Sequence, residues 1–320
     1  MVDYHLLWSV LIGVSILIIL ILKFKIQPFL GLLISSIIVG VLAGVAPLEI
    51  MNTVKEGMGS TLGFVAVVVG LGAMFGAILE HSGGAEALAQ YLLKAFGEKN
   101  ASWALMITGF FIAIPVFFDV AFIILIPLVY SLQRKTKKSL LLYAIPLLAG
   151  LAITHAFIPP TPGPVAVADI LHADLGWVIL VGFIVGIPTA IVSGPIFGKF
   201  IASKIFIAAP KKIDKEVVDN FPPIRLILSI IATPILLIVL NTLVTSPISS
   251  DLNLSENTIS WLQMIGHPFS ALIIANLMAW YLLGIRRGIS KAILSKITSA
   301  SLAPAGIIIL LTGAGGVFKQ

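Results

Sequence analysis

The sequence predicts an all-α polytopic membrane protein, and two observations support this fold class. Of its 320 residues, 59% are hydrophobic and only 11% are charged. A soluble domain carries about 25% charged residues to solvate its surface, so lipid must cover much of this chain. Several uncharged stretches also reach the ~20 residues that a helix needs to cross a hydrocarbon core of ~30 Å.

Nine apolar stretches define the predicted spans in chain order. The first is a retained span rather than a signal peptide, because no Lys or Arg precedes it and no small-residue cleavage site follows it. Only one of the nine contains a charged side chain, Asp119. The stretches are Leu6–Leu22, Gln27–Pro47, Thr61–Leu79, Ala101–Gln133, Ser139–Ala168, Leu175–Gly198, Leu226–Pro247, Ile259–Ile285 and Ile297–Phe318.

Loop charges predict how the spans are oriented. Three loops are rich in Lys and Arg and should be cytoplasmic, whereas the Ser246–Glu256 loop carries only the acids Asp251 and Glu256 and should face outside. Two crossings separate each consecutive pair of basic loops, so the assignment is self-consistent. The basic loop residues are Arg134, Lys135, Lys137 and Lys138; Lys199, Lys204, Lys211, Lys212, Lys215 and Arg225; and Arg286, Arg287, Lys291 and Lys296.

The N-terminal third of the chain requires an irregular segment. If the turn at Lys23 and Lys25 is cytoplasmic, the chain is outside near Pro47 and must be inside again by Arg134. That requires an odd number of crossings from the third and fourth stretches. We therefore expect one of these stretches to be re-entrant, or the fourth to cross twice.

Proline and glycine mark the expected breaks in these two stretches. Pro115 interrupts the fourth stretch, and Gly70, Gly72 and Gly76 interrupt the third. Non-helical backbone at membrane depth persists only where protein or a wet cavity satisfies its polar groups. Both interruptions therefore indicate a functional site.

The proline-rich stretch Thr154-His-Ala-Phe-Ile-Pro-Pro-Thr-Pro-Gly-Pro164 is the most informative part of the sequence. Prolines lack a backbone donor and hold the preceding residue extended, which predicts a loop over these residues. Thr154, His155, Thr161 and Gly163 would offer side-chain and backbone groups to a ligand, because unwound backbone beside a helix end binds ions and carboxylates in transporters. An ordinary external loop is the alternative interpretation.

Two ionisable side chains inside the apolar stretches are candidates for the site, Asp119 and His155. A carboxylate at the depth of Asp119 costs roughly 3 kcal/mol or more, so it should face a cavity or partner and is suited to carry a proton. His155 is the only histidine in its stretch, which has no charged side chain, and it is suited to relay a proton or bind an anion. The structural alternatives are that Asp119 caps a half-helix after Pro115 and that His155 bonds a neighbouring carbonyl.

The segment Glu80-His-Ser-Gly-Gly84 ends the glycine-rich stretch and has two interpretations. It is either a helix cap with an interface turn or a part of the site. In the second case Ser82 would contact the substrate and Glu80 would take part in proton coupling.

Several function classes are excluded by the sequence. Without cysteine there is no disulfide, iron–sulfur cluster or thiolate metal site. The His-Glu-x-x-His, Gly-x-Ser-x-Gly and Gly-x-x-x-x-Gly-Lys motifs are absent, so we expect no enzyme, no metal site and no cofactor. The formal charge of +6 arises from loop residues that set orientation, so we expect no nucleic-acid partner.

Two short segments are similar to each other, namely Gly70-Leu-Gly-Ala-Met-Phe75 and Gly313-Ala-Gly-Gly-Val-Phe318. They favour the duplicated architecture of secondary transporters, although spaced glycines in apolar sequence also recur by chance. On this interpretation, residues 1–200 form a first transmembrane repeat with the broken-helix site and 201–225 a cytoplasmic basic linker. Residues 226–320 then begin a second repeat that is incomplete, and we expect the chain to be a fragment.

The same segments resemble the gluconate permease (GntP) family of sugar-acid:proton symporters. The resemblance rests on Gly72-Ala-Met-Phe-Gly-Ala-Ile-Leu-Glu-His-Ser-Gly-Gly84, on Ile114-Pro-Val-Phe-Phe-Asp119, and on His155–Pro164 running into Ala168-Asp-Ile-Leu-His-Ala-Asp-Leu-Gly176. It implies a bacterial inner-membrane location and a helical ion-transporter-type fold with two repeats. It also implies import of gluconate-like hydroxy acids with protons, while relatives take other sugar acids, glycerate or D-serine.

We therefore expect a secondary active transporter that lies in the bilayer and imports gluconate or a related sugar acid by proton symport. The alternatives are a sodium-coupled carboxylate carrier and a non-transporting membrane scaffold or sensor subunit, and homo-oligomer formation is left open. The expected substrate-binding residues are Thr154, His155, Thr161, Gly163, Gly72 and Ser82. The expected proton-coupling residues are Asp119, His155 and Glu80.

Overall fold

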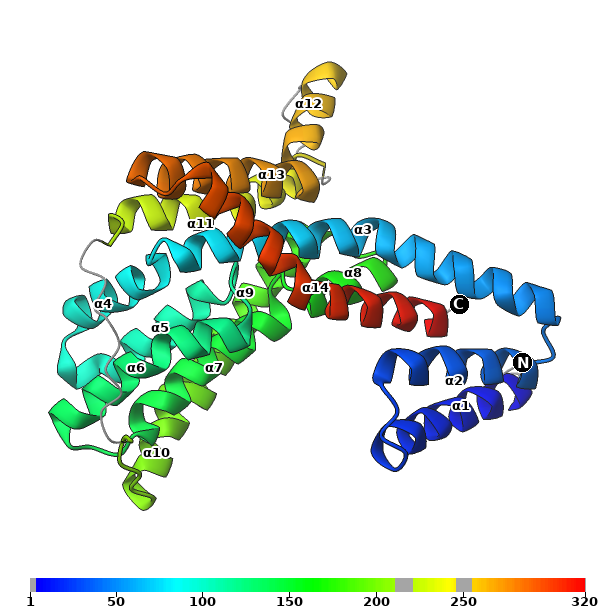
Figure 1. Cartoon of the computed structure of the whole chain (residues 1–320), viewed down its shortest axis with the longest axis horizontal. Helices are drawn as coiled ribbons and strands as arrows, with labels where there is room; N and C mark the ends of the chain where they lie inside the picture. The colour runs from blue at the N-terminus through cyan, green and yellow to red at the C-terminus, as the bar shows by residue number, and fades with distance from the viewer. Residues whose placement is uncertain (1–3, 211–220, 246–254, 320) are drawn as a thin grey trace. The chain divides into compact units, whose positions relative to one another are not determined.

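The computed structural model describes residues 4–210, 221–245 and 255–319, and every regular element in these ranges is a helix (Figure 1). η2 and η4 are single π turns, and η1 and η5 are short 3₁₀ turns. The elements are α1 (Tyr4–Leu22), α2 (Pro28–Leu42), α3 (Pro47–His81), α4 (Gly84–Phe96), η1 (Glu98–Asn100), α5 (Ala101–Ile112), α6 (Phe118–Thr136), α7 (Leu141–Phe157), α8 (Pro162–Ile170), α9 (Leu175–Ile191), η2 (Val192–Ile196), α10 (Phe197–Lys204), α11 (Ile224–Thr245), α12 (Glu256–Gly266), α13 (Pro268–Ala279), η4 (Trp280–Gly284), η5 (Ile285–Arg287) and α14 (Lys291–Lys319).

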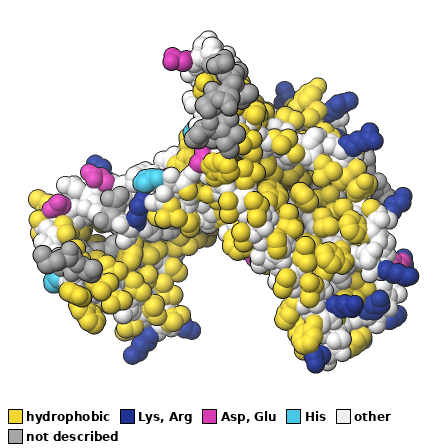
Figure 2. All heavy atoms as spheres, turned by 180° about the vertical axis from the view of Figure 1, so that it is seen from behind, with side chains coloured by type: hydrophobic (Ala, Val, Ile, Leu, Met, Phe, Trp, Pro, Cys, Tyr) yellow, Lys and Arg dark blue, Asp and Glu magenta, His cyan; other side chains and the backbone are white. Residues whose placement is uncertain are grey.

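Seven helical segments of the described chain are long and apolar enough to cross a membrane, which confirms the all-helical membrane class. Hydrophobic side chains cover much of the face drawn in Figure 2, as lipid-facing helices require. α2 is apolar but only 15 residues long. The seven segments are Tyr4–Leu22, Pro47–His81, Leu141–Ile170, Leu175–Lys204, Ile224–Thr245, Pro268–Arg287 and Lys291–Lys319.

The chain divides into two compact units. Unit 1 comprises Met1–Val67, Asp169–His172 and Ala303–Gln320, and unit 2 comprises Val68–Ala168 and Ala173–Leu302. The predicted repeat boundaries and the second repeat remain predictions. Part of the predicted basic linker, with Lys211, Lys212 and Lys215, lies outside the described residues, as does Asp251 in the predicted external loop.

The glycine-rich stretch is not broken, which corrects the first of our expectations. Gly70, Gly72 and Gly76 lie inside one continuous helix, α3. A glycine costs a helix only about 1 kcal/mol relative to alanine, and lipid penalises any unpaired backbone group more than that. These glycines therefore leave the helix intact and change what can pack against it.

The proline-rich stretch is also more helical than expected. α7 continues through Thr154 and His155 to Phe157, α8 begins at Pro162, and only residues 158–161 are non-helical. Pro162 and Pro164 occupy the first turn of α8, where backbone N–H groups have no intrahelical acceptor and a fixed φ favours helix initiation. The predicted loop is therefore reduced to a four-residue break.

The prediction of a break at Pro115 is confirmed, and the break forms the tip of a helical hairpin. α5 ends at Ile112 and α6 begins at Phe118.

Two contacts give the direction of α5 relative to α7. Ser102 donates to the Leu142 carbonyl oxygen at 2.7 Å, and farther along α5 a Cβ at Gly150 would lie 2.8 Å from the Phe110 nitrogen. From the first contact to the second, the residue numbers rise on both helices, so α5 runs parallel to α7.

α6 runs the opposite way. The Tyr143 hydroxyl donates to Thr136 Oγ1 at 2.9 Å near the start of α7, whereas Phe117 contacts His155 near its end. α5 and α6 are therefore antiparallel, and the ion pair between Lys135 and Glu98 closes the open end of the hairpin.

The hairpin bears on the question of chain direction in the N-terminal third. α5 has 12 residues and is about 18 Å long, which is too short for a core of ~30 Å. A re-entrant α5–α6 hairpin would contribute no net crossing, and α3 would then supply the single crossing that the basic loops require. This matches one of the arrangements that the charge pattern left open.

The stretch predicted as a single span at Ile259–Ile285 is two helices. α12 ends at Gly266, and the His267 imidazole accepts from the Phe269 N–H at 3.3 Å at the start of α13. Pro268 occupies the first position of α13, which explains the break because a proline there starts a helix but cannot continue one. Only the second piece, Pro268–Arg287, is among the candidate spans.

Candidate functional site at two helix breaks

The two helix breaks of unit 2 lie against the same part of α3. Residues 114–117, from the tip of the α5–α6 hairpin, and residues 160–162, from the α7–α8 break, line one hollow together with Val69, Gly72 and Ala73. Three segments far apart in the sequence therefore converge at one point. Gly72 and Thr161, both predicted from the sequence, line this hollow.

The glycines of α3 make this convergence sterically feasible. A Cβ at Gly72 would lie 3.8 Å from the Pro160 carbonyl oxygen, and one at Gly76 would overlap the Pro115 carbonyl oxygen and lie 3.2 Å from the Val116 Cα. The two glycines are four residues apart and so lie on one face of the helix. One face of α3 thus receives both breaks, with main chain against main chain.

The hollow is small in this conformation. Its volume is about 10 Å³, close to the smallest cavity volume that can hold one water molecule. A ligand larger than water would require the hairpin tip and the α7–α8 break to separate.

Two polar atoms near the end of α7 have no hydrogen-bond partner among the described residues. Thr154 Oγ1 is fully buried, and the buried Nδ1 of His155 lies one residue farther along. The His155 ring packs edge-on against Phe117, with 6.4 Å between ring centroids, and Phe117 lines the hollow. Unpaired buried polar groups are costly and call for a ligand, an ion or water.

Asp119 lies in the first turn of α6, two residues after Phe117. Its carboxylate is close enough to His155 to interact with it electrostatically. The side chain is exposed rather than buried, and no capping hydrogen bond is recorded at this end of α6. The capping alternative therefore has no hydrogen bond to support it.

Helix ends supply the remaining polar groups of the site. α6 and α8 both begin beside the hollow, and the positive end of a helix dipole favours an anion. Pro162 and Pro164 carry no N–H, so Gly163 is the amide donor between them, and open space lies beside its Cα. The Thr161 hydroxyl instead donates to the Ile158 carbonyl oxygen at 2.6 Å and stabilises the break.

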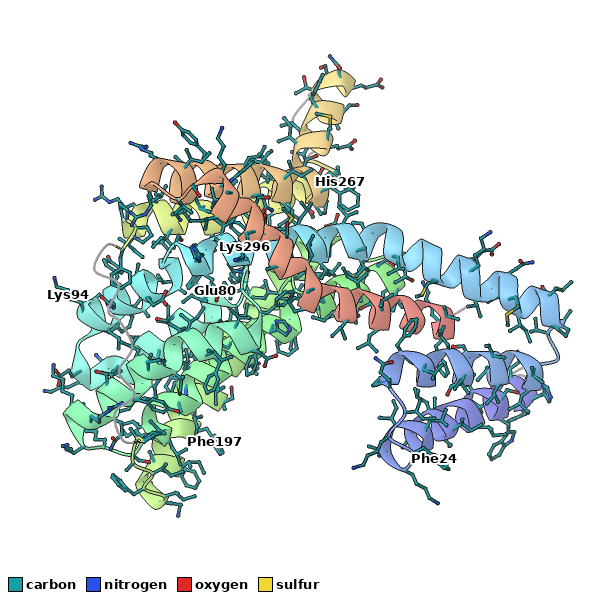
Figure 3. All side chains as sticks on the ribbon, viewed as in Figure 1. Phe24, Glu80, Lys94, Phe197, His267 and Lys296 are labelled. Atoms are coloured by element: carbon teal, nitrogen blue, oxygen red, sulfur yellow. The ribbon has the colours of Figure 1, made fainter. Side chains whose placement is uncertain are left out.

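Two of the predicted residues lie elsewhere. Ser82 follows the last turn of α3, and its hydroxyl donates to the Leu79 carbonyl oxygen at 2.9 Å. Glu80 lies at the same end of α3, where its carboxylate interacts with that of Glu86 (Figure 3). Ten residues of helix separate Ser82 from Gly72, about 15 Å along the axis. The structure therefore does not bring Ser82 and Glu80 to the hollow.

Sequence reasoning missed Asn276, a polar residue in the middle of α13. Its Nδ2 donates to the Leu71 carbonyl oxygen of α3 and to the Leu272 carbonyl oxygen, both at 2.9 Å. Its buried Oδ1 has no partner among the described residues. A lone amide in an apolar span is a signal that could have identified it, and it ties α13 to α3 next to Gly72.

Comparison with known proteins identifies the family. The profile described as GntP family permease matches residues 5–320. The chain belongs to this family. It is therefore a multi-span membrane transporter and not an enzyme.

Curated relatives are similar over nearly the whole chain. A gluconate permease from Pseudomonas aeruginosa is 36% identical over 99% of this chain and 71% of its own length. A low-affinity gluconate transporter from Escherichia coli K12 is 39% identical over 96% and 69%, respectively. The inner membrane permease YgbN of the same strain is 39% identical over 98% and 71%. These relatives agree with the expected location in a bacterial inner membrane.

Proposed function

We propose that this permease imports gluconate or a related small sugar acid together with protons. The observation that carries the proposal is the convergence of two helix breaks on the Gly72–Gly76 face of α3, and one of these breaks follows the end of α7 that holds the unpaired Thr154 hydroxyl oxygen. Broken helices at membrane depth are where secondary transporters bind substrates. The gluconate permeases among its relatives supply the substrate class.

The substrate carboxylate would bind at the starts of α6 and α8. Gly163 would donate its N–H, and both helix dipoles would favour the negative charge. Thr154 and Thr161 would face substrate hydroxyl groups, and His155 would donate or accept a hydrogen bond according to its protonation state. Binding would open the hollow by moving the hairpin tip away from Pro160.

Proton coupling would depend on Asp119 and His155. The two groups lie near each other, and the Asp119 side chain is exposed in the first turn of α6. A proton taken up with the anion offsets its negative charge, which lowers the cost of carrying that charge through the bilayer. Glu80 is the least supported of the proposed proton carriers, because it lies at the far end of α3.

Uptake measurements test the proposed function. We expect cells that express the protein to accumulate labelled gluconate when the outside is more acidic than the inside, and to lose accumulation when the gradient is collapsed. A sodium gradient at constant pH should have no effect, whereas sodium-dependent uptake would favour a cation site at the Thr154 oxygen. Glycerate, D-serine and other sugar acids as competitors would rank the substrates.

The change Asp119→Asn tests the proton carrier. We expect it to abolish accumulation against a gradient while leaving exchange of labelled for unlabelled substrate, because exchange requires substrate binding but no net proton movement. Asp169→Asn, which changes a carboxylate that does not line the hollow, is the control. Loss of membrane insertion in the Asp119 variant, or unimpaired accumulation, would contradict this role.

A further inference from the structure

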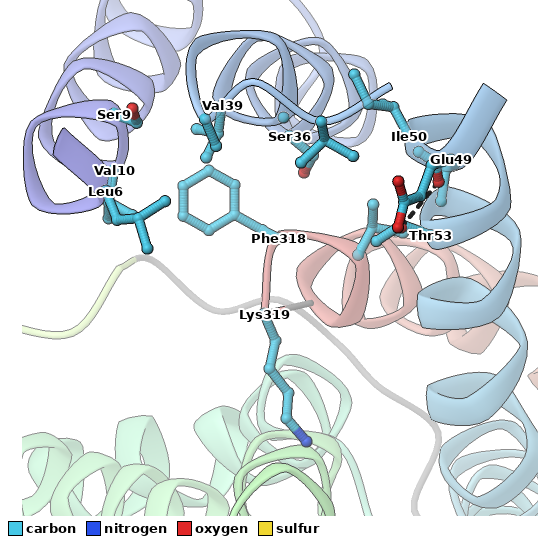
Figure 4. A pocket seen from close by; sticks show the side chains of 15 residues that line it. Leu6, Ser9, Val10, Ser36, Val39, Glu49, Ile50, Thr53, Phe318 and Lys319 are labelled. Carbon is cyan, nitrogen blue, oxygen red and sulfur yellow. Dashed lines mark hydrogen bonds between the residues drawn. The ribbon is translucent and has the colours of Figure 1, made fainter. Parts of the chain in front are cut away.

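Unit 1 contains a cavity that the transport site does not use. Its volume is about 470 Å³, within the ~300–1,000 Å³ range of pockets that hold small ligands. The first half of α1, the second half of α2, the start of α3 and the end of α14 enclose it (Figure 4). Apolar side chains form most of the wall, including Leu6, Val39, Ile50 and Phe318.

The hydroxyl groups of the wall are not available as donors. Ser9 donates to the His5 carbonyl oxygen, Ser36 to the Leu32 carbonyl oxygen and Thr53 to the Glu49 carbonyl oxygen, each at 2.9 Å. A sugar acid needs several donors for its carboxylate, and this wall offers none from these hydroxyls. An alkyl chain needs only apolar contact, so the wall fits a chain of methylene groups.

Two charged residues line the cavity, Glu49 and Lys319. Glu49 lines it and is exposed, so its carboxylate can meet a cation without leaving water. Lys319 is exposed as well, and its side chain points away from the Phe318 ring (Figure 4). Glu49 favours an ammonium group and Lys319 favours a phosphate, so this pair of charges suits a zwitterionic headgroup better than a purely anionic one.

The surroundings of the cavity are those of lipid. α1 is a candidate span whose large hydrophobic side chains are mostly exposed. Val10 and Lys23 are 13 residues apart on or next to α1, so the cavity lies about 20 Å along the helix from the basic turn. That distance places the cavity in the leaflet opposite the basic turn.

We propose that this cavity binds the acyl chain of a phospholipid whose ammonium headgroup contacts Glu49. Phosphatidylethanolamine has this chemistry, and phosphatidylglycerol has chains of the same kind with an anionic headgroup. The site does not depend on the function proposed for the helix breaks.

Native mass spectrometry of the purified 320-residue chain tests the proposal. The protein would be offered phosphatidylethanolamine and phosphatidylglycerol with identical chains in equal amounts. We expect bound phosphatidylethanolamine to exceed phosphatidylglycerol by about two- to fivefold, the range that an exposed ion pair supports. Glu49→Gln should remove this preference, while Glu56→Gln, seven residues farther along α3 and outside the cavity, should keep it.

A second pair of variants tests the chain-binding part independently of charge. Ser36→Phe should fill the cavity and reduce the bound lipid to the background level. Ser15→Phe, whose serine makes the same type of hydroxyl–carbonyl bond outside the cavity, should leave it unchanged. Equal binding of both lipids by the parent protein, equal behaviour of a variant and its control, or a second copy of the chain in place of lipid would each overturn the proposal.

Discussion

Gly72 and Gly76 act through the side chains that they lack. At both positions the space for a Cβ faces a main-chain carbonyl of a helix break, at Pro160 and at Pro115. A continuous helix can approach a broken one this closely only where no side chain intervenes. The conformational freedom of glycine is not used here, since both residues are helical.

Gly76→Ala should therefore destabilise the protein. The added methyl would overlap the Pro115 carbonyl oxygen, and overpacking costs about 1–3 kcal/mol, which outweighs the gain of about 1 kcal/mol in helix propensity. Gly59→Ala is a matched control on the same helix, with nothing within 4 Å of its Cβ. We expect a lower thermal midpoint in detergent for Gly76→Ala and an unchanged or higher one for Gly59→Ala. Equal shifts would contradict the packing role.

Thr154 and Asn276 illustrate a different residue-scale feature, a buried oxygen without a partner. Thr154 Oγ1 lies near the end of α7, and Asn276 Oδ1 lies on α13, where the Asn276 Nδ2 bonds the Leu71 carbonyl oxygen next to Gly72. A folded protein leaves such atoms unpaired only where something else completes them. They are the strongest reason to place a polar ligand among these helices.

At the scale of elements, the α5–α6 hairpin is the decisive structure. Its open end is closed by the Lys135–Glu98 ion pair, and its tip reaches the end of α7. Close contact with α7 fixes the depth of the tip, because a Cβ at Gly109 would lie only 2.6 Å from the Leu147 carbonyl oxygen. The hairpin thereby carries the Pro115 break to the α7–α8 break.

Cysteine accessibility tests the hairpin. The chain has no cysteine, so single variants report one position each. We expect Lys99→Cys and Lys138→Cys, at the two ends of the hairpin, to react with an impermeant thiol reagent only after cells are permeabilised. Ala173→Cys, beyond α8, should react in intact cells. Opposite accessibility of the first two positions would mean that α5–α6 crosses the bilayer.

At the scale of the whole molecule, the order of crossings follows from charge and helix length together. The basic loops after α6, α10 and α13 require an even number of crossings between them, and α7–α8 with α9–α10, then α11 with α13, supply two each. With α3 as one crossing and the hairpin as none, the N-terminal third fits the same scheme. The predicted orientation is therefore compatible with the helices as they are formed.

The sequence by itself determined the membrane class, the breaks at Pro115 and near Pro159, and the family, because these depend on composition and on local backbone chemistry. Two expectations from the sequence were wrong, namely a helix break at the glycines of α3 and a loop over the whole proline-rich stretch. Both were wrong because helix continuity depends on what packs nearby. It placed Ser82 and Glu80 with the site because they follow Gly72 closely in sequence.

Only the tertiary structure decided which faces meet. In a bilayer, buried and lipid-facing side chains are both apolar, so periodicity carries no information about which face is inside. The pairing of Gly76 with Pro115, the direction of the hairpin and the bond from Asn276 to Leu71 are contacts between distant segments. Such contacts arise from packing, which no local pattern records.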